Sequence, residues 1–228
     1  MKVAVVVFPG SNCERDCEHV LENVIGASVV RAWHRDHELP KVDCVVLPGG
    51  FSYGDYLRAG AVSKISPIMK AVSEFAFSGG PVIGICNGFQ VLLECGLLPG
   101  AMLRNRSLRF VCKDTFVRCA TERTPFTSGL SLGEVLKLPI AHAEGNYYVD
   151  AEELRALQDN DQIVFQYTSG DGEANDGANP NGSIFNIAGV CNRAGNVLGM
   201  MPHPERAAED VLGNSGGAAL FASIIHTL

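Results

Sequence analysis

Several features that would assign this chain to a large class of proteins are missing from its sequence. No segment approaches the roughly 20 consecutive apolar residues that span a bilayer. The apolar segment at residues 2–8 stops at Pro9-Gly10 without a small-residue cleavage pattern, so it is expected to be a strand and not a signal peptide. No Gly-x-x-x-x-Gly-Lys-Ser/Thr loop for nucleotide phosphates occurs. These absences argue against a membrane protein and against nucleotide binding of that type.

Basic residues are also fewer than acidic residues. The chain has 18 Lys and Arg against 25 Asp and Glu, which gives a formal net charge of −7. Nucleic-acid binding depends on clustered Lys and Arg, and no continuous run of them exists. We therefore expect no nucleic-acid partner, and the acidic balance suits small-molecule chemistry.

Cysteine, by contrast, is plentiful, and there are eight in the chain. Without a secretory signal, this number predicts free thiols in a reducing, cytoplasmic compartment. Cys13 and Cys17 are one helical turn apart, but no second pair of Cys or His at ligand spacing accompanies them. We therefore predict no metal site and favour structural or incidental roles for both cysteines.

Hydrophobic patterning predicts an α/β fold. Apolar β-rich segments alternate with helical patterns in the first half, with strands expected near 2–8, 28–33, 43–47 and 81–85, and helices near 12–25, 63–78 and 87–95. This order indicates a doubly wound, mostly parallel sheet with helices on both faces, a flavodoxin-like arrangement. The second half adds a more mixed, antiparallel region, with strands near 108–119, 162–167, 184–191 and 196–201 and a helix near 215–226. The length of 228 residues fits one domain, residues 1–228.

The most informative motif follows the strand at 81–85. Cys86 has Gly84 two residues before it and Gly88 two residues after it. A sharp strand-to-helix turn crowds these positions, so glycines there are typical of a nucleophile elbow, here with sulfur in place of oxygen. The helix that follows would favour the thiolate. A buried cysteine that merely ends a core strand is the alternative at this point.

Two further motifs end apolar strands. His203 and Glu205 follow the strand near 196–201 with one residue between them, so both side chains can project on one face. A carboxylate beside an imidazole fixes its tautomer and leaves the other nitrogen free to take a proton from Cys86. Gly49-Gly50 follows the strand near 43–47, and its amides, with that of Asn87, could form an oxyanion hole.

These three motifs together resemble the class I, triad-type glutamine amidotransferases. Longer strings narrow the resemblance to the branch that forms separate glutaminase subunits of phosphoribosylformylglycinamidine synthase, in purine biosynthesis. The strings are Phe8-Pro9-Gly10-Ser11-Asn12-Cys13, Gly49 to Gly60, Cys86-Asn87-Gly88-Phe89-Gln90 and Met201 to Ala207. The resemblance runs essentially end to end.

The resemblance implies a role for each matching residue. Cys86 would attack the side-chain amide of L-glutamine, His203 would protonate the departing ammonia, and Glu205 would orient His203. Oxyanion-hole amides would come from Gly50 and Asn87, and the glutamine pocket would be lined by Gln90, Glu144, Gly145 and Asn146. The chain itself would need no cofactor. Its ammonia would pass to a synthetase that uses ATP and magnesium, and a small bridging subunit would join the two.

Two other classes of function stay open. A stand-alone cysteine hydrolase or peptidase could use a similar elbow, but such families place histidine directly after the nucleophile, where this chain has Asn87. A non-catalytic scaffold could keep the elbow for structural reasons, but the intact His203-Pro204-Glu205 disfavours it.

Several other polar residues have two interpretations each. His142 fits a pocket residue or, preferably, a hydrogen-bonded loop histidine, while His34 and His37 are expected at the surface. The segment Asp55-Tyr56-Leu57-Arg58 could contact a partner or pack beside the elbow. The polar stretch between Thr168 and Ser183 is expected to be a surface loop, with partner contact as the alternative.

Overall fold

The predicted parallel sheet has central strands that are buried on both faces. In the computed structural model, which describes residues 1–227, these strands lie side by side in the order β2-β1-β3-β4-β11. Their bounds are β1 Lys2–Val7, β2 Ser28–Trp33, β3 Cys44–Leu47, β4 Val82–Ile85 and β11 Val197–Met200. Every residue of β3, β4 and β11 is buried. Such continuous burial explains the unbroken apolar segments in the sequence.

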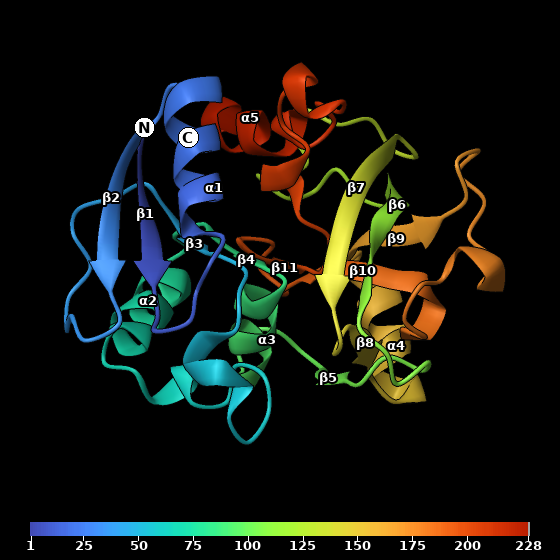
Figure 1. Ribbon diagram of the computed structural model, residues 1–228, viewed down its shortest axis with the longest axis horizontal. Helices are drawn as coiled ribbons and strands as arrows, with labels where there is room; N and C mark the ends of the chain where they lie inside the picture. The colour runs from blue at the N-terminus through green and yellow to red at the C-terminus, as the bar shows by residue number, and fades with distance from the viewer. Residues whose placement is uncertain (228) are drawn as a thin grey trace.

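Helices connect and cover these strands. Their bounds are α1 Glu14–His19, continued by a π-helical turn at Val20–Val24, α2 Ile68–Phe77, α3 Asn87–Glu94, α4 Ala151–Asp159 and α5 Ala218–Thr227. Figure 1 shows α1 in front of the parallel strands and α2 behind them. Short 3-10 helices lie at Ser52–Asp55, Ser63–Ile65, Asp176–Ala178, Ile184–Asn186, Pro204–Arg206 and Asp210–Leu212. The prediction of an α/β sheet with helices on both faces is confirmed.

The same sheet continues as an antiparallel region beyond β11. Its further order is β10-β9-β6-β7, and each neighbouring pair is antiparallel. The bounds are β6 Val111–Cys119, β7 Val135–His142, β9 Ile163–Thr168 and β10 Ile187–Cys191. A separate antiparallel pair joins β5 Ala101–Leu103 to β8 Asn146–Tyr148. The mixed character predicted for the second half is therefore confirmed.

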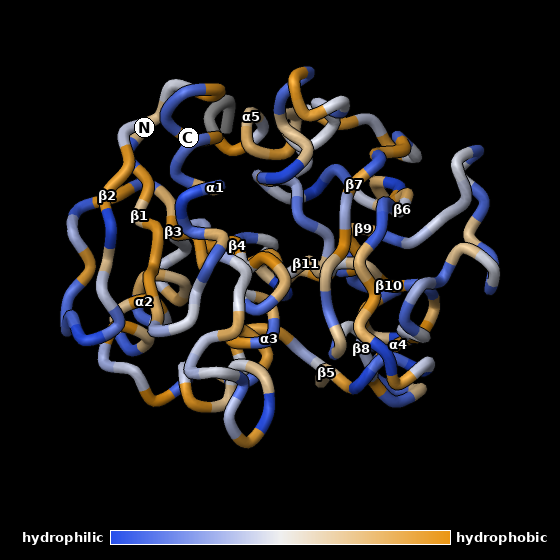
Figure 2. The backbone as a smooth tube through the Cα atoms, in the orientation of Figure 1, coloured by the Kyte–Doolittle hydropathy of each residue, from blue (hydrophilic) through white to orange (hydrophobic). Residues whose placement is uncertain are grey.

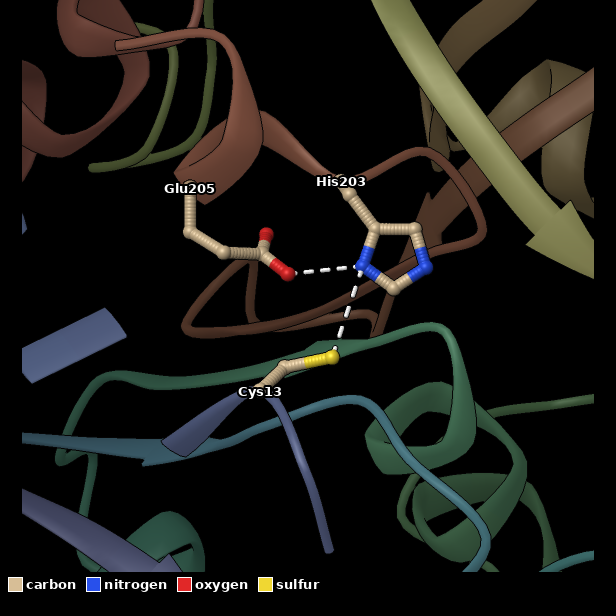
Figure 3. Close-up of side chains that lie close together, drawn as sticks. All are labelled: Cys13, His203 and Glu205. Atoms are coloured by element: carbon tan, nitrogen blue, oxygen red, sulfur yellow. Dashed lines mark hydrogen bonds and ion pairs between the residues drawn. The ribbon is translucent and has the colours of Figure 1, made fainter. Parts of the chain in front are cut away.

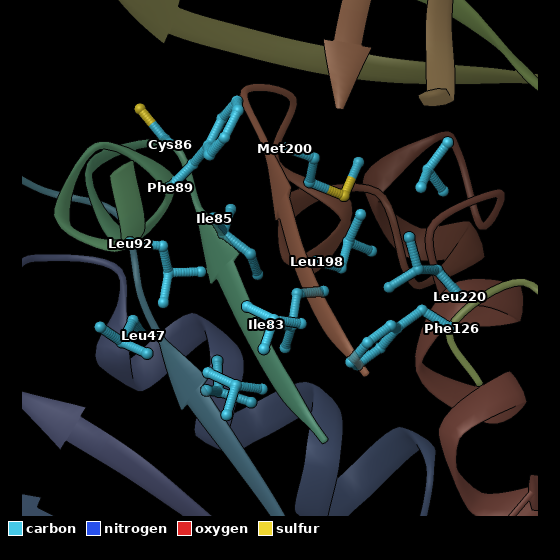
Figure 4. Close-up of a cluster of buried hydrophobic side chains, with 14 of the residues drawn as sticks. Leu47, Ile83, Ile85, Cys86, Phe89, Leu92, Phe126, Leu198, Met200 and Leu220 are labelled. Atoms are coloured by element: carbon cyan, nitrogen blue, oxygen red, sulfur yellow. The ribbon is translucent and has the colours of Figure 1, made fainter. Parts of the chain in front are cut away.

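Glycines let α3 sit directly on the sheet. Gly84 of β4 lies beside Gly199 of β11. A Cβ on Gly84 would lie 2.6 Å from the Gly88 backbone, and one on Gly199 would lie 2.0 Å from the Phe89 ring. Figure 4 shows Ile83, Ile85, Leu198 and Met200 of the two strands, with Phe89 and Leu92 of α3 among the same buried cluster. Each fully buried side chain of this size contributes about 1.5–3 kcal/mol to folding.

Apolar residues concentrate in the strands of the sheet, and polar residues concentrate in the loops around it (Figure 2). Within residues 1–227, no helix combines the length and the apolar character that a membrane crossing requires. All eight cysteines are free thiols.

Some local expectations are wrong. The strand expected from residue 184 begins only at Ile187, because Phe185 adopts a left-handed backbone with φ 53° that interrupts an extended chain. His34 was expected at the surface, yet only 6% of it is exposed. It lies beneath the segment after β3, where the Tyr53 hydroxyl is 2.6 Å from its Nδ1.

Candidate active site

Cys86 occupies the strained turn that its flanking glycines predict. Its backbone has φ 50° and ψ −104°, a combination that costs a non-glycine residue about 1–3 kcal/mol. The Cys86 N–H donates to Met200 O at 2.8 Å, which ties the turn to β11. A Cβ on Gly88 would lie 2.0 Å from Leu47 O at the end of β3. The glycines therefore permit the turn, and the turn places Cys86 at the start of α3.

His203 and Glu205 form a buried ion pair beside this turn. Figure 3 shows the Glu205 carboxylate pointing at the imidazole, and the Oε1 to Nδ1 distance is 2.6 Å. Both residues are 2% exposed. Burial by itself would lower the pKa of His203, but the carboxylate of Glu205, with Cys86 contributing next, outweighs it and raises this pKa well above its usual value. The pair is therefore arranged to stabilise an imidazolium.

The other ring nitrogen of His203 is available for chemistry. Its Nε2 is buried and lacks a hydrogen-bond partner within the described residues. The Cys86 thiol contacts Ala141 O at 3.8 Å, and Cys86 lies near enough to the imidazole for its charge to raise the pKa of His203. A free Nε2 on an imidazole whose Nδ1 is held by a carboxylate can accept the thiol proton and later return it. The structure thus brings together the three predicted catalytic side chains.

Backbone amides for an oxyanion lie at the end of β3. Gly49 O accepts hydrogen bonds from Asn12 N at 3.4 Å and Cys13 N at 3.2 Å. Because the carbonyl and N–H of a trans peptide point in opposite directions, the Gly50 N–H points away from these donors. Gly50 lines the same cavity as Cys86. Its φ of +143° and the 2.7 Å from an added Cβ to Asn12 N make glycine necessary there.

Asn87, the first residue of α3, has an N–H without a partner inside the helix, as helix starts require. Its side chain anchors the neighbouring loop, because Oδ1 accepts from Ser52 N at 3.0 Å. Its Nδ2 donates to Gln90 Oε1 at 2.9 Å and to Asp55 Oδ1 at 3.2 Å. Gln90 Nε2 in turn donates to Glu144 O at 2.7 Å. Asn87 and Gln90 therefore link the elbow by hydrogen bonds to the segment after β3 and to Glu144.

The cavity itself is small, at about 70 Å³. Its walls are Gly50, Phe51, Asp55, Cys86, Gln90, Ala141, His142, Ala143 and Glu144. Of the predicted glutamine-pocket residues, Gly50, Gln90 and Glu144 line it. Gly145 and Asn146 do not: Gly145 N donates to Asn105 Oδ1, and Asn146 lies in a separate polar hollow, where its Nδ2 reaches Arg104 O.

Asp55 is a cavity residue that was not predicted to line the glutamine pocket, although the segment 55–58 was named as one that could pack beside the elbow. It lines the cavity together with Glu144. Burial, followed by the charge of Glu144, raises the pKa of Asp55 to about 6, although the hydrogen bond from Asn87 opposes this. Its position in the segment after β3 could have indicated this role, because ligands bind at the carboxyl ends of parallel strands.

His142 lies in the cavity wall but is unsuited to be the base. Asn181 Oδ1 accepts from Ser183 N, so its Nδ2 faces His142 Nε2 at 3.2 Å. Nε2 is then the acceptor, and burial, with His203 second, lowers the pKa of His142 to about 4. The ring is therefore neutral near pH 7 and already hydrogen-bonded.

Cys13 lies beside the His203–Glu205 pair and is not part of the cavity wall (Figure 3). Its Sγ is 4.0 Å from His203 Nδ1 and accepts a hydrogen bond from Arg206 at 2.9 Å. Cys13, His203 and Glu205 lie close enough to be considered as metal ligands. The guanidinium of Arg206 already brings a positive charge to this sulfur, which disfavours a cation there. Burial raises the pKa of the Cys13 thiol, so we assign it a packing role beside His203.

An activated cysteine, a histidine that can return its proton and amides for an oxyanion together define a cysteine-dependent enzyme that cleaves amides. The chain belongs to the family of CobB/CobQ-like glutamine amidotransferase domains, whose model matches residues 1–217. The resemblance seen in its motifs is therefore confirmed.

Individual relatives show which members of this family the chain is similar to. The chain is 58% identical to phosphoribosylformylglycinamidine synthase subunit PurQ of Moorella thermoacetica, covering 99% of this chain and 95% of that protein. It is 55% identical to the PurQ subunit of Koribacter versatilis, covering 100% and 99%. Among solved structures, a chain from the structure of PurLQS from Thermotoga maritima matches with a TM-score of 0.87 and 41% identity, covering 99% of this chain and 98% of that one.

Proposed function

We propose that this chain is the glutaminase subunit of phosphoribosylformylglycinamidine synthase. The observation that carries the proposal is the Cys86 elbow, set against the His203–Glu205 pair in a chain that matches PurQ subunits along its full length. The substrate is L-glutamine, and the ammonia released serves the ATP-dependent conversion of formylglycinamide ribonucleotide to formylglycinamidine ribonucleotide in purine biosynthesis.

The geometry supports the following course of the reaction. Cys86 Sγ attacks the amide carbon of glutamine while His203 takes the thiol proton, and the oxyanion forms against the amides of Gly50 and Asn87. His203 returns the proton to the nitrogen as the carbon–nitrogen bond breaks, which leaves a thioester and releases ammonia. Water then attacks the thioester, His203 again moves the proton, and glutamate leaves with Cys86 regenerated.

The synthetase partner and the remaining chemistry belong to the same proposal. ATP and magnesium would act in the synthetase subunit and not in this chain. The match to a chain from a structure titled PurLQS supports an assembly with other subunits, and we expect a small bridging subunit among them.

We expect the isolated chain to hydrolyse glutamine slowly. Ligand pockets usually enclose about 300–1,000 Å³, and the cavity of about 70 Å³ at Cys86 lies well below that range, so we expect it to widen when glutamine binds. A steady-state glutaminase assay of the chain alone, repeated with saturating synthetase, formylglycinamide ribonucleotide and ATP, should show at least a tenfold rise. Equal rates would contradict the proposal and favour a stand-alone hydrolase.

Asp55 and Glu144 supply negative charge for the α-ammonium group of glutamine. We expect Asp55→Asn to raise KM for glutamine by about 10–100-fold with little change in kcat, the range for a lost hydrogen bond between charged groups. With the pKa of Asp55 near 6, the wild-type KM should also rise as pH falls through 6, because the carboxylate becomes protonated. The Asn variant should lack this dependence.

Steady-state kinetics between pH 5 and 8 test this prediction. Asp159→Asn, at an exposed position in α4, is the matched control and should leave KM unchanged. An Asp55→Asn enzyme with wild-type KM would rule out the ammonium contact.

A further inference from the structure

The loop between β5 and β6 carries an unbalanced positive charge in an acidic chain. Arg104, Arg106 and Arg109 all lie within six residues and are exposed. None of them pairs with a carboxylate anywhere in residues 1–227. Like charges held this close repel one another, so an acidic binding partner would be stabilising.

Exposed apolar side chains surround these arginines. Leu108 is 68% exposed, Phe110 and Phe185 are each 51% exposed, and Tyr148 is 50% exposed. Arg106, Tyr148 and Phe185 line one polar hollow of about 680 Å³, which also holds Arg118 and a single carboxylate, Asp176. We call the loop 104–110 together with Tyr148 and Phe185 the arginine face. Arginine and aromatic residues are the types enriched in protein interfaces.

The arginine face is connected to the wall of the glutamine cavity through Asn105. This residue is completely buried between two exposed arginines. Its N–H donates to Ala143 O at 2.8 Å, its Nδ2 donates to His142 O at 2.9 Å, and its Oδ1 accepts from Gly145 N at 3.0 Å. Residues 142–144 are part of the cavity wall. The loop and this wall are therefore one hydrogen-bonded unit.

A second link runs through Asn181. Arg106 N donates to Asn181 O at 2.8 Å, and Asn181 Nδ2 contacts His142 Nε2. Figure 1 shows β5 and β8 in the lower right of the view, toward which the strands β1 and β2 also point downward from the left. The arginine face is thus joined to the cavity wall by two sets of hydrogen bonds, through Asn105 and through Asn181.

We propose that the arginine face is the docking surface for an acidic patch of the synthetase subunit, and that docking sets the position of the cavity wall through Asn105. The inference rests on the function proposed above. It adds the place where the synthetase binds this chain and the hydrogen bonds through which that binding opens the cavity. An acidic protein surface is favoured over nucleic acid because the chain as a whole carries a net charge of −7.

The first test is a charge reversal. Arg106→Glu/Arg109→Glu should weaken binding to the purified synthetase by about 100-fold, measured by titration calorimetry at 0.15 M salt, and should flatten its salt dependence. Lys2→Glu/Lys41→Glu makes the same change in charge next to the amino ends of β1 and β3 and should bind within about threefold of wild type. Glutaminase activity of either isolated variant should stay unchanged.

The outcomes separate the two proposals. If the wild-type chain fails to bind the synthetase, the proposed function is wrong. If the wild type binds and the arginine variant binds equally well, the docking surface is wrong while the function stands. Loss of affinity for a single-stranded RNA probe, without loss for the synthetase, would also overturn the docking surface.

The second test concerns the link. Asn105→Asp keeps the size and the acceptor for Gly145 N but loses the donor to both His142 O and Arg109 O. It should bind the synthetase within a few-fold of wild type yet lose most of the stimulation of glutaminase activity. Hydrogen exchange of the amides at 143–145 in the wild-type complex provides a measurement independent of folding defects. Unchanged exchange on binding would refute the link.

Discussion

Cys86→Ala is expected to lower glutamine hydrolysis on the order of 10⁴-fold or more, as nucleophile removal does in other triad hydrolases. Alanine is small enough for the turn, and Cys13, the other thiol near His203, is buried outside the cavity. With added ammonium salt, the complex with the synthetase should still make product, because only the source of ammonia is lost. A steady-state assay with each nitrogen donor measures both effects.

The matched control is Cys112→Ala, which removes an exposed thiol in β6 and should keep full activity. Mass spectrometry after treatment with a glutamine-mimicking electrophile gives a second readout, in which Cys86 should be the labelled site that glutamine protects. Loss of the ammonia-supported activity in Cys86→Ala would instead mean that Cys86 is structural.

His203→Ala should cost far more activity than Glu205→Gln. The imidazole carries the transferred proton, whereas the carboxylate only orients and charges it, so the loss at Glu205 should be smaller by at least about tenfold and fall mainly in kcat. Removing the carboxylate takes away the largest effect that opposes burial, so the pKa of His203 should fall and the pH–rate profile of Glu205→Gln should move to lower pH. Measured kcat values across pH test both statements.

Equal losses in the two variants would contradict this division of roles. A glutaminase rate that is insensitive to His203→Ala would point to His142 as the base, and the double variant His142→Ala/His203→Ala would then lose the remaining rate.

The parallel half of the fold could be predicted because each strand there is a continuous apolar segment. The elements missed have weaker signals. β7 contains Pro139 and alternates in burial, and no strand was expected there. β5 and β8 have three residues each. For α4, the signal was present, since Asp150 caps the helix by accepting hydrogen bonds from Glu152 N and Glu153 N, but its composition is mostly polar.

Some residues of the candidate site could likewise be predicted from the sequence, and others could not. Cys86, His203 and Glu205 lie in local motifs at strand ends, and the geometry of such motifs is set within a few residues. Asn105 and Asp55 acquire their positions from contacts with segments far along the chain, which one sequence does not reveal. The same reason explains Gly145 and Asn146: adjacency to Glu144 in sequence does not place them in the same cavity.

The backbone strain at Cys86 also bears on how much sequence change this protein tolerates. A typical domain is stable by only about 5–15 kcal/mol, and a non-glycine residue held at φ 50° uses about 1–3 kcal/mol of that margin. The nucleophile therefore brings the whole chain nearer to its unfolding threshold. Destabilising substitutions at core positions far from Cys86 therefore have a smaller stability reserve to draw on, so the chemistry at one turn limits how much core change the fold can tolerate.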